Sequence, residues 1–255
     1  MKTTWWTAAA FSVATAALLA GCAGSGPSMG SDPVVLVEYA EARIEAGKYL
    51  DAVDYLEHFA RSYPGSALMP RVRMRLGDAR FGLGQYILAE GEYSAVVQDF
   101  RASPFAEEAE FGIARSAFAS ILPYDLDQSI TERAIVLLSD FRANHPESDY
   151  RAEVEESLAE CRDRLARREY EAGLFYEKQR RLRSAKIQHE YILQHFPETV
   201  WAARACFRLG SIHGSRGELD LAASWYRKVA EMGPDTDEAA EALSILAGMH
   251  SEEAD

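Results

Sequence analysis

The feature that most constrains the fold of this chain is a break that recurs along it. At four places a proline, followed two residues later by serine or threonine, separates apolar helix-forming stretches: Pro64-Gly65-Ser66, Pro146-Glu147-Ser148, Pro197-Glu198-Thr199 and Pro234-Asp235-Thr236. Proline ends a helix because it lacks a backbone N–H and clashes with the preceding turn, and a hydroxyl group can accept the free N–H groups of the next helix. The pattern predicts a succession of helices joined by short breaks.

Small residues recur at fixed distances from these breaks. Each of the four prolines follows an alanine by twelve residues, the alanines being Ala52, Ala134, Ala185 and Ala222. A fifth alanine, Ala89, lies 37 residues after Ala52 and leads instead to Ser103-Pro104, an expected N-cap followed by proline. Four of these alanines are each preceded, thirteen positions earlier, by the start of a residue pair that contains a small residue. The pairs are Tyr39-Ala40, Leu76-Gly77, Ala172-Gly173 and Leu209-Gly210. Small side chains at these positions allow paired helices to approach closely.

This arrangement resembles the tetratricopeptide repeat, a helix-turn-helix unit of about 34 residues with a small residue at the helix crossing and a closing proline. One such pair cannot bury its own apolar face, so neighbouring pairs stack into a superhelix whose concave side is lined by first helices. We therefore expect an all-α protein, an α-solenoid of about five tetratricopeptide (TPR) repeats over residues 34–250, with a disordered tail at 251–255.

The middle of the predicted solenoid carries extra residues. Ala89 and Ala134 are 45 residues apart, and Ala134 and Ala185 are 51 apart. An irregular loop that begins at residue 122 accounts for the first excess, and Ser129 and Glu132 are spaced to form a capping box for the helix that follows it. A helix that starts near residue 150 and runs to 178 without a proline accounts for the second.

The first 21 residues predict a cleaved signal peptide rather than part of the fold. Lys2 precedes an almost wholly apolar stretch from Trp5 to Leu19, and this stretch of about 15 residues is short for a transmembrane helix, which needs about 20. An uncleaved signal anchor is the alternative. The tetrapeptide Leu19-Ala20-Gly21-Cys22 resembles the bacterial lipobox, which implies lipidation of Cys22 as the first residue of the mature protein. Residues 22–33, rich in glycine and serine, are expected to form a flexible tether.

Composition argues against several classes of function. The chain has a formal net charge of −13, which becomes −14 when the signal peptide with Lys2 is removed, so the basic surface needed for nucleic-acid binding is not expected. The six histidines show no metal-binding spacing and no phosphate-binding loop is present, so we expect no enzyme, no metal site and no cofactor besides the lipid on Cys22. Cys161 and Cys206 are expected to be buried free thiols, with a disulfide between them as the alternative.

A closer resemblance covers nearly the whole chain after the signal peptide. Five repeats behind a lipobox, an insertion with Pro123, Asp127, Gln128, Ser129 and Thr131, and the stretch "DRLARREYEAGLFYEKQRRLRSA" before a "FPET" break are similar to the BamD family. That family is the outer-membrane lipoprotein of the β-barrel assembly machinery. The resemblance implies a lipid-anchored scaffold on the periplasmic face of the outer membrane. Its implied partners are the central barrel-inserting component and unfolded outer-membrane β-barrel proteins.

Nine basic and four acidic residues lie between Arg162 and Lys186, a stretch that we call the basic segment. From the residues alone, this segment is either a solvated helix face with Glu–Arg pairs or a docking surface for an acidic patch on another protein. The BamD resemblance implies the second interpretation, with the periplasmic domain of the central component as the partner. The residues expected to carry this contact are Arg162, Arg164, Arg167, Arg168, Arg180 and Arg181.

The first helices of the first two repeats carry equivalent faces 37 residues apart. Helical spacing places three side chains on each face, and these are Val37, Glu41 and Ile44, and Met74, Asp78 and Phe81. The six residues form either partly buried contacts between helices or an apolar groove. The resemblance implies a groove that holds an extended segment of an unfolded outer-membrane protein.

Two other functions remain open on the sequence. One is a TPR lipoprotein scaffold of another cell-envelope or division complex, which would not need the insertion at 123–131 or the unbroken helix to residue 178. The other is an envelope enzyme or carrier subunit that acts on peptidoglycan or polysaccharide, which would need a carboxylate cluster or a metal site that the sequence does not contain.

Overall fold

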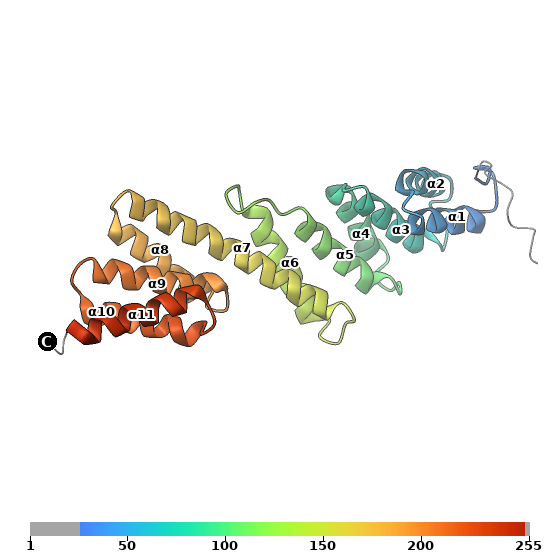
Figure 1. Cartoon of the computed structure of the whole chain (residues 1–255). Helices are drawn as coiled ribbons and strands as arrows, with labels where there is room; N and C mark the ends of the chain where they lie inside the picture. The colour runs from blue at the N-terminus through green and yellow to red at the C-terminus, as the bar shows by residue number, and fades with distance from the viewer. Residues whose placement is uncertain (1–25, 253–255) are drawn as a thin grey trace, which may run out of the picture.

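The computed structural model describes residues 26–252, which form helices joined by short turns (Figure 1). The described residues hold eleven α-helices and no β-strand. The helices are α1 (Pro33–Glu45), α2 (Tyr49–Ser62), α3 (Met69–Gly82), α4 (Tyr86–Asp99), α5 (Ala106–Ala119), α6 (Ser129–Asn144), α7 (Arg151–Lys178), α8 (Leu182–His195), α9 (Val200–Gly214), α10 (Leu219–Met232) and α11 (Asp237–Glu252). The predicted signal peptide and Cys22 lie outside the described residues.

Ten of these helices pack as five pairs, and α11 closes the array. Each helix contacts the next one in the chain, and first helices of successive pairs also meet, at α1–α3, α3–α5, α7–α9 and α9–α11. Figure 1 shows an elongated array with α1 and α2 at one end and α10 and α11 at the other. The prediction of an α-solenoid of five repeats is therefore confirmed, and α11 covers the apolar face that the last pair would otherwise expose.

In three repeats, an aromatic ring or imidazole of the second helix packs directly against a glycine of the first helix. The ring residue stands four positions after the repeat alanine, and the pairs are Gly77 with Tyr93, Gly173 with His189, and Gly210 with Tyr226. A Cβ atom added to these glycines would lie 2.4, 2.4 and 2.7 Å from the ring, which is well inside van der Waals contact. The small residues therefore have the packing role that their spacing predicts.

The turn between the two helices of a pair uses one residue in the left-handed region. Gly47, Gly84 and Gly217 have φ values of 68°, 72° and 74°, and Arg180 occupies the equivalent position of the fourth pair with φ 56°. Glycine adopts this conformation readily, whereas a residue with a Cβ pays about 1 kcal/mol for it. The turn between α7 and α8 is therefore strained where the three glycine turns are relaxed.

Replacing Arg180 with glycine is expected to raise the free energy of unfolding by about 0.5–1 kcal/mol, because relief of this strain outweighs the greater freedom of glycine in the unfolded chain. Arg181→Gly is the matched control: Arg181 is also exposed, but its φ is −89°, so glycine there is expected to be neutral or destabilising. Urea unfolding of both variants measures the difference. Equal effects of the two substitutions would contradict the assignment of strain to Arg180.

The long α7 is unbroken from Arg151 to Lys178, as the missing proline predicts. The loop inserted before α6 is held by Gln128, whose buried amide donates hydrogen bonds to the carbonyl oxygens of Pro123 at 2.8 Å and Leu126 at 3.0 Å. The predicted capping box of Ser129 with Glu132 is wrong. The N-cap of α6 is Gln128, and Ser129 donates its N–H and its hydroxyl to Asp127, which lies two residues earlier.

The ends of the described chain differ from the expected domain boundaries. Residues 26–33 belong to the predicted flexible tether, yet Asp32 caps α1 by accepting a hydrogen bond from the Val34 N–H at 2.8 Å, and Pro33 is the first residue of the helix. At the other end, α11 continues to Glu252, two residues beyond the predicted end of the solenoid. Among the described helices, none combines the length and the apolar character that a bilayer crossing requires.

Cys161 and Cys206 are free and buried in separate parts of the core, which confirms the expectation of two free thiols. Burial raises the pKa of both thiols to about 11. A thiol reacts as its thiolate, so both cysteines are expected to resist modification at neutral pH.

Candidate partner and substrate surfaces

Four of the predicted groove residues line one cavity of about 350 Å³, and they are Ile44, Met74, Asp78 and Phe81. A second cavity of about 390 Å³ is lined by Glu41, Ile44 and Asp78 among others. Ile44 and Asp78 line both, so the two cavities are adjacent on the first helices α1, α3 and α5. We call them together the N-terminal groove.

The walls of the N-terminal groove combine aromatic rings with paired charges. The guanidinium of Arg115 lies 4.3 Å from the centroid of the Phe81 ring and 3.7 Å from an Asp78 carboxylate oxygen. Asp78 also accepts a hydrogen bond of 2.6 Å from Arg75. Because these charges are compensated inside the groove, it suits an extended peptide with apolar side chains better than a highly charged ligand.

Val37 does not line the groove. It is 1% exposed and packs in the core of the first repeat. The core cluster around Val37 is built from residues of α1, α2 and α3, and helical spacing alone did not separate Val37 from its neighbours on the same helix.

The groove also contains residues that the sequence reasoning missed. Phe111 and Arg115 of α5 line the cavity of about 350 Å³ and lie 37 residues after Met74 and Asp78, so extending the same spacing by one repeat would have found both. Tyr150 lies in the turn before α7 and stacks on Phe111 with ring centroids 4.3 Å apart. No spacing in the sequence indicates this contact of Tyr150.

Two arginines of the basic segment are hydrogen-bonded to distant parts of the chain. Arg162 donates to the carbonyl oxygen of His195 at 2.8 Å and forms an ion pair with Glu198. Arg164 donates to the carbonyl oxygen of Leu122 at 2.6 Å. Both side chains therefore hold helices and loops together, and they are less available to a partner than the sequence predicts.

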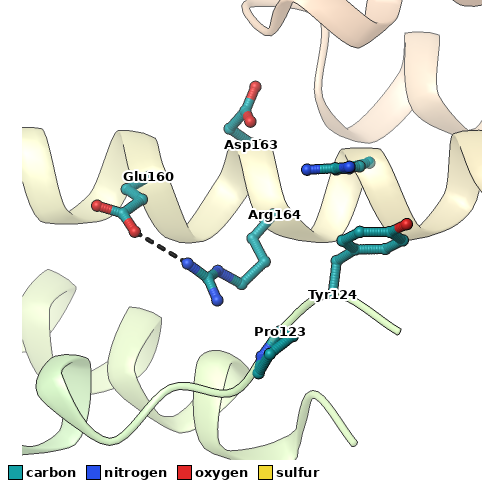
Figure 2. A pocket seen from close by; sticks show the side chains of 6 residues that line it. Pro123, Tyr124, Glu160, Asp163 and Arg164 are labelled. Carbon is teal, nitrogen blue, oxygen red and sulfur yellow. Dashed lines mark hydrogen bonds and ion pairs between the residues drawn. The ribbon is translucent and has the colours of Figure 1, made fainter. Parts of the chain in front are cut away.

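Figure 2 shows the place where the inserted loop crosses α7. Arg164 points from α7 toward the loop that carries Pro123 and Tyr124, and it forms an ion pair of 3.0 Å with Glu160 one turn earlier. These residues line a cavity of about 430 Å³. The guanidinium of Arg167 lies 4.0 Å from the centroid of the Tyr124 ring, a cation–π contact that fastens the loop to α7.

The remaining predicted arginines, Arg168, Arg180 and Arg181, are exposed and have no ion pair within the described part of the chain. Lys178 and Arg183 share both properties. Four of these five cations lie within six residues at the turn between α7 and α8. We call the five residues the free cations, and they form the part of the basic segment that is available to an acidic partner.

One acidic residue of the basic segment, Glu177, is paired with two side chains of neighbouring helices. Glu177 forms an ion pair with Arg208 of α9 and a hydrogen bond of 2.8 Å with Nε2 of the buried His189. Burial alone would raise the pKa of Glu177, but the hydrogen bonds from His189 and Arg208 outweigh it and the pKa is lowered. Glu177 therefore joins α7, α8 and α9 and does not neutralise the free cations.

The lowered pKa of Glu177 predicts an acid-sensitive contribution to stability. A carboxyl group with a depressed pKa in the folded state stabilises the protein above its unfolded pKa, about 4.3, and this stabilisation is lost as the pH falls through the lower folded value. Glu177→Gln is expected to reduce the free energy of unfolding by about 2 kcal/mol at pH 7 and to flatten its dependence between pH 5 and 3. Urea unfolding measured between pH 7 and pH 3 tests both expectations. Glu190→Gln is the control, because Glu190 forms only an exposed ion pair with Lys186.

No group of three or more histidine, cysteine, aspartate or glutamate side chains within residues 26–252 is arranged to hold a metal ion. The surfaces described above consist of a groove, exposed cations and a long connecting helix. They define a TPR-type α-solenoid that carries a groove and a cluster of exposed cations on its surface.

Comparison with known proteins identifies the family. Residues 31–228 match the model of the YfiO family, described as "Outer membrane lipoprotein", and the chain belongs to this family, which is the BamD family. The chain is 28% identical over 202 residues to the "Outer membrane protein assembly factor BamD" of Caulobacter vibrioides. That match covers 77% of this chain and 66% of the relative.

Two solved structures match at lower similarity. A thermophilic TPR protein of Thermus thermophilus, TTC0263, is 17% identical, with 85% of this chain and 100% of that chain covered and a TM-score of 0.37. The MamA protein of Desulfovibrio magneticus RS-1 is 19% identical, with 82% and 99% covered and a TM-score of 0.36. The fold assignment rests on the helix pairs described above.

Proposed function

We propose that this protein is a lipid-anchored scaffold subunit of the outer-membrane β-barrel assembly machinery, held at the periplasmic face of the outer membrane by lipid on Cys22. It binds unfolded outer-membrane proteins and the central barrel-inserting component on different parts of one solenoid. The observation that carries this proposal is the family match over residues 31–228, a range that includes both the N-terminal groove and the free cations. The relative named an outer membrane protein assembly factor supports it.

In this proposal the N-terminal groove receives an extended segment of an unfolded outer-membrane protein. A β-barrel strand alternates apolar and polar side chains, so one edge of the extended chain can contact the partly exposed Phe81 and Ile44 while the other faces solvent. Met74 is 1% exposed and supports the Phe81 side chain from the core. Methionine and aromatic side chains adapt to many sequences, which suits a site that must accept different substrates. The proposed mechanism consists of binding alone, and no residue takes part in a covalent step.

Binding of a labelled peptide tests the groove. The probe is a fluorescent peptide copied from the last strand of an outer-membrane protein of the same organism, titrated with the purified periplasmic part of the protein. Phe81→Glu is expected to weaken binding at least tenfold, because a charge replaces a ring at the centre of the contact. Ile87→Glu is the control, since the Ile87 side chain is 83% exposed on α4. Equal affinities of the two variants, both folded by circular dichroism, would contradict the groove assignment.

In the same proposal the free cations dock the central barrel-inserting component through acidic groups on its periplasmic domain. Exposed arginines that form no internal ion pair can make bidentate contacts with carboxylates of a partner. Arg162, Arg164 and Arg167 contribute indirectly, since they fix the inserted loop and α8 to α7. The alternative, a scaffold of another envelope complex, shares the fold and the anchor and differs only in the partner recovered.

A further inference from the structure

The first described residues are packed against the solenoid. Residues 26–31, which we call the strap, lie before α1 and contact α2. The hydroxyl of Tyr55 donates a hydrogen bond of 2.9 Å to the carbonyl oxygen of Pro27, and Nε2 of His58 lies 2.9 Å from the carbonyl oxygen of Met29. Both contacts join residues 28 or more positions apart, so they fix the path of the strap on the first repeat.

The strap begins at a position that only glycine fits. A Cβ atom on Gly26 would lie 2.4 Å from the Tyr55 hydroxyl oxygen and 2.5 Å from the ring of Tyr39. These two rings pack on each other with centroids 4.7 Å apart, so neither can move away freely. The aromatic pair therefore holds the strap at its first residue.

The packed strap shortens the connection to the membrane. The predicted tether of residues 22–33 would allow the solenoid to swing, but only four peptide units separate Cys22 from Gly26. Fully extended, they span at most about 14 Å. The polar headgroup layer takes about 5–8 Å of that length, so a lipid on Cys22 brings the strap within several ångströms of the bilayer surface.

Apolar side chains are exposed at this same end of the molecule. Met29 of the strap is 38% exposed, and Val34 and Val35 in the first turn of α1 are each 44% exposed. Figure 1 shows that this end is the extremity of the elongated array, far from α10 and α11. Exposed apolar side chains beside a lipid anchor can enter the headgroup region and add to the binding energy of the acyl chains.

We propose that the strap and the first turn of α1 form a membrane-contact surface that seats directly on the phospholipid bilayer. The contact fixes the orientation of the first repeat, and with it the direction in which the N-terminal groove faces. This inference rests on the lipidation of Cys22 in the proposed function and adds a second contact to the anchor.

Fluorescence quenching in vesicles tests this inference. The full-length lipidated protein, purified from membranes and reconstituted in phosphatidylethanolamine–phosphatidylglycerol vesicles, carries an environment-sensitive dye on Val34→Cys. Because Cys161 and Cys206 are buried with raised thiol pKa values, the dye is expected to label only the introduced cysteine. Leu243→Cys on α11, 53% exposed at the other end of the array, is the matched control.

Brominated lipids are expected to quench the dye at Val34→Cys at least twofold and to leave the dye at Leu243→Cys unchanged. Adding Gly26→Val, or the milder Tyr55→Phe if Gly26→Val does not fold, is expected to reduce the quenching at Val34→Cys because the strap is released. Vesicle flotation with no quenching at Val34→Cys would overturn the membrane contact and leave the proposed function intact. Failure of the wild-type protein to float would overturn both the anchor and this inference.

Discussion

Changing Cys22 to serine is expected to remove most of the protein from the outer-membrane fraction. Two or three acyl chains each bury many CH₂ groups, at about 0.8 kcal/mol per group, and without them nothing in residues 26–252 can hold the protein in a bilayer by spanning it. Serine cannot form the thioether, so the precursor is also expected to keep its signal peptide. Membrane fractionation, electrophoretic mobility and incorporation of an alkyne-labelled fatty acid measure the three effects.

Cys161→Ser provides the control for the Cys22 experiment, because Cys161 is buried and is expected to have no part in anchoring. This variant should label with fatty acid and fractionate as the wild type does. An uncleaved signal anchor, the alternative for residues 1–21, predicts instead that Cys22→Ser leaves both mobility and membrane association unchanged. That result would contradict the lipobox interpretation.

Replacing Gly77 with leucine is expected to have the largest effect on stability, a loss of about 3 kcal/mol or more. Tyr93 is fully buried between two glycines, and Cβ atoms on Gly77 and Gly112 would lie 2.4 and 2.8 Å from its ring. The ring cannot move away from one helix without striking the other, so the added side chain must separate α3 from α4 or α5. Because a solenoid is stabilised by interfaces between neighbours, the N-terminal repeats are expected to unfold before the rest.

Gly91→Ala is the matched control for Gly77→Leu. Gly91 is an exposed glycine inside α4, and a Cβ atom there meets nothing within 4 Å. Alanine has the higher helix propensity, so the substitution is expected to stabilise the protein by about 0.5–1 kcal/mol. Thermal and urea unfolding followed by circular dichroism distinguish the two variants, and a single cooperative transition at wild-type stability for Gly77→Leu would refute the packing account.

The repeat architecture could be predicted from the sequence because its signals are local. The alanine and proline spacing reflects helix lengths and crossings that recur in each pair, and the unbroken α7 follows from the absence of a proline between Arg151 and Lys178. The repeat of equivalent faces every 37 residues singled out the residues of the groove, and the BamD resemblance implied that they form one. Val37 shows the limit of this reasoning, because helical spacing does not say which neighbour a given side chain will meet.

The basic segment could not be resolved from the sequence because its contacts are distant. Arg164 meets Leu122, 42 residues away, and Arg162 meets Glu198, 36 residues away. Composition shows an excess of charge, but only the folded chain shows which cations are engaged internally. The strap is a similar case, since its glycine and serine content predicts flexibility and only the folded positions of Tyr39 and Tyr55 reveal where it packs.

The central claim is that the protein works as a scaffold of the β-barrel assembly machinery, and affinity purification from membranes solubilised in mild detergent tests it most directly. With the full-length lipoprotein as bait, we expect recovery of a large β-barrel protein with a periplasmic domain. We expect that recovery to fall at least fivefold when Arg168, Arg180 and Arg181 are all changed to glutamate. Recovery of no such barrel protein with the wild-type bait would contradict the proposed function, and undiminished recovery with the charge-reversed bait would contradict the docking surface.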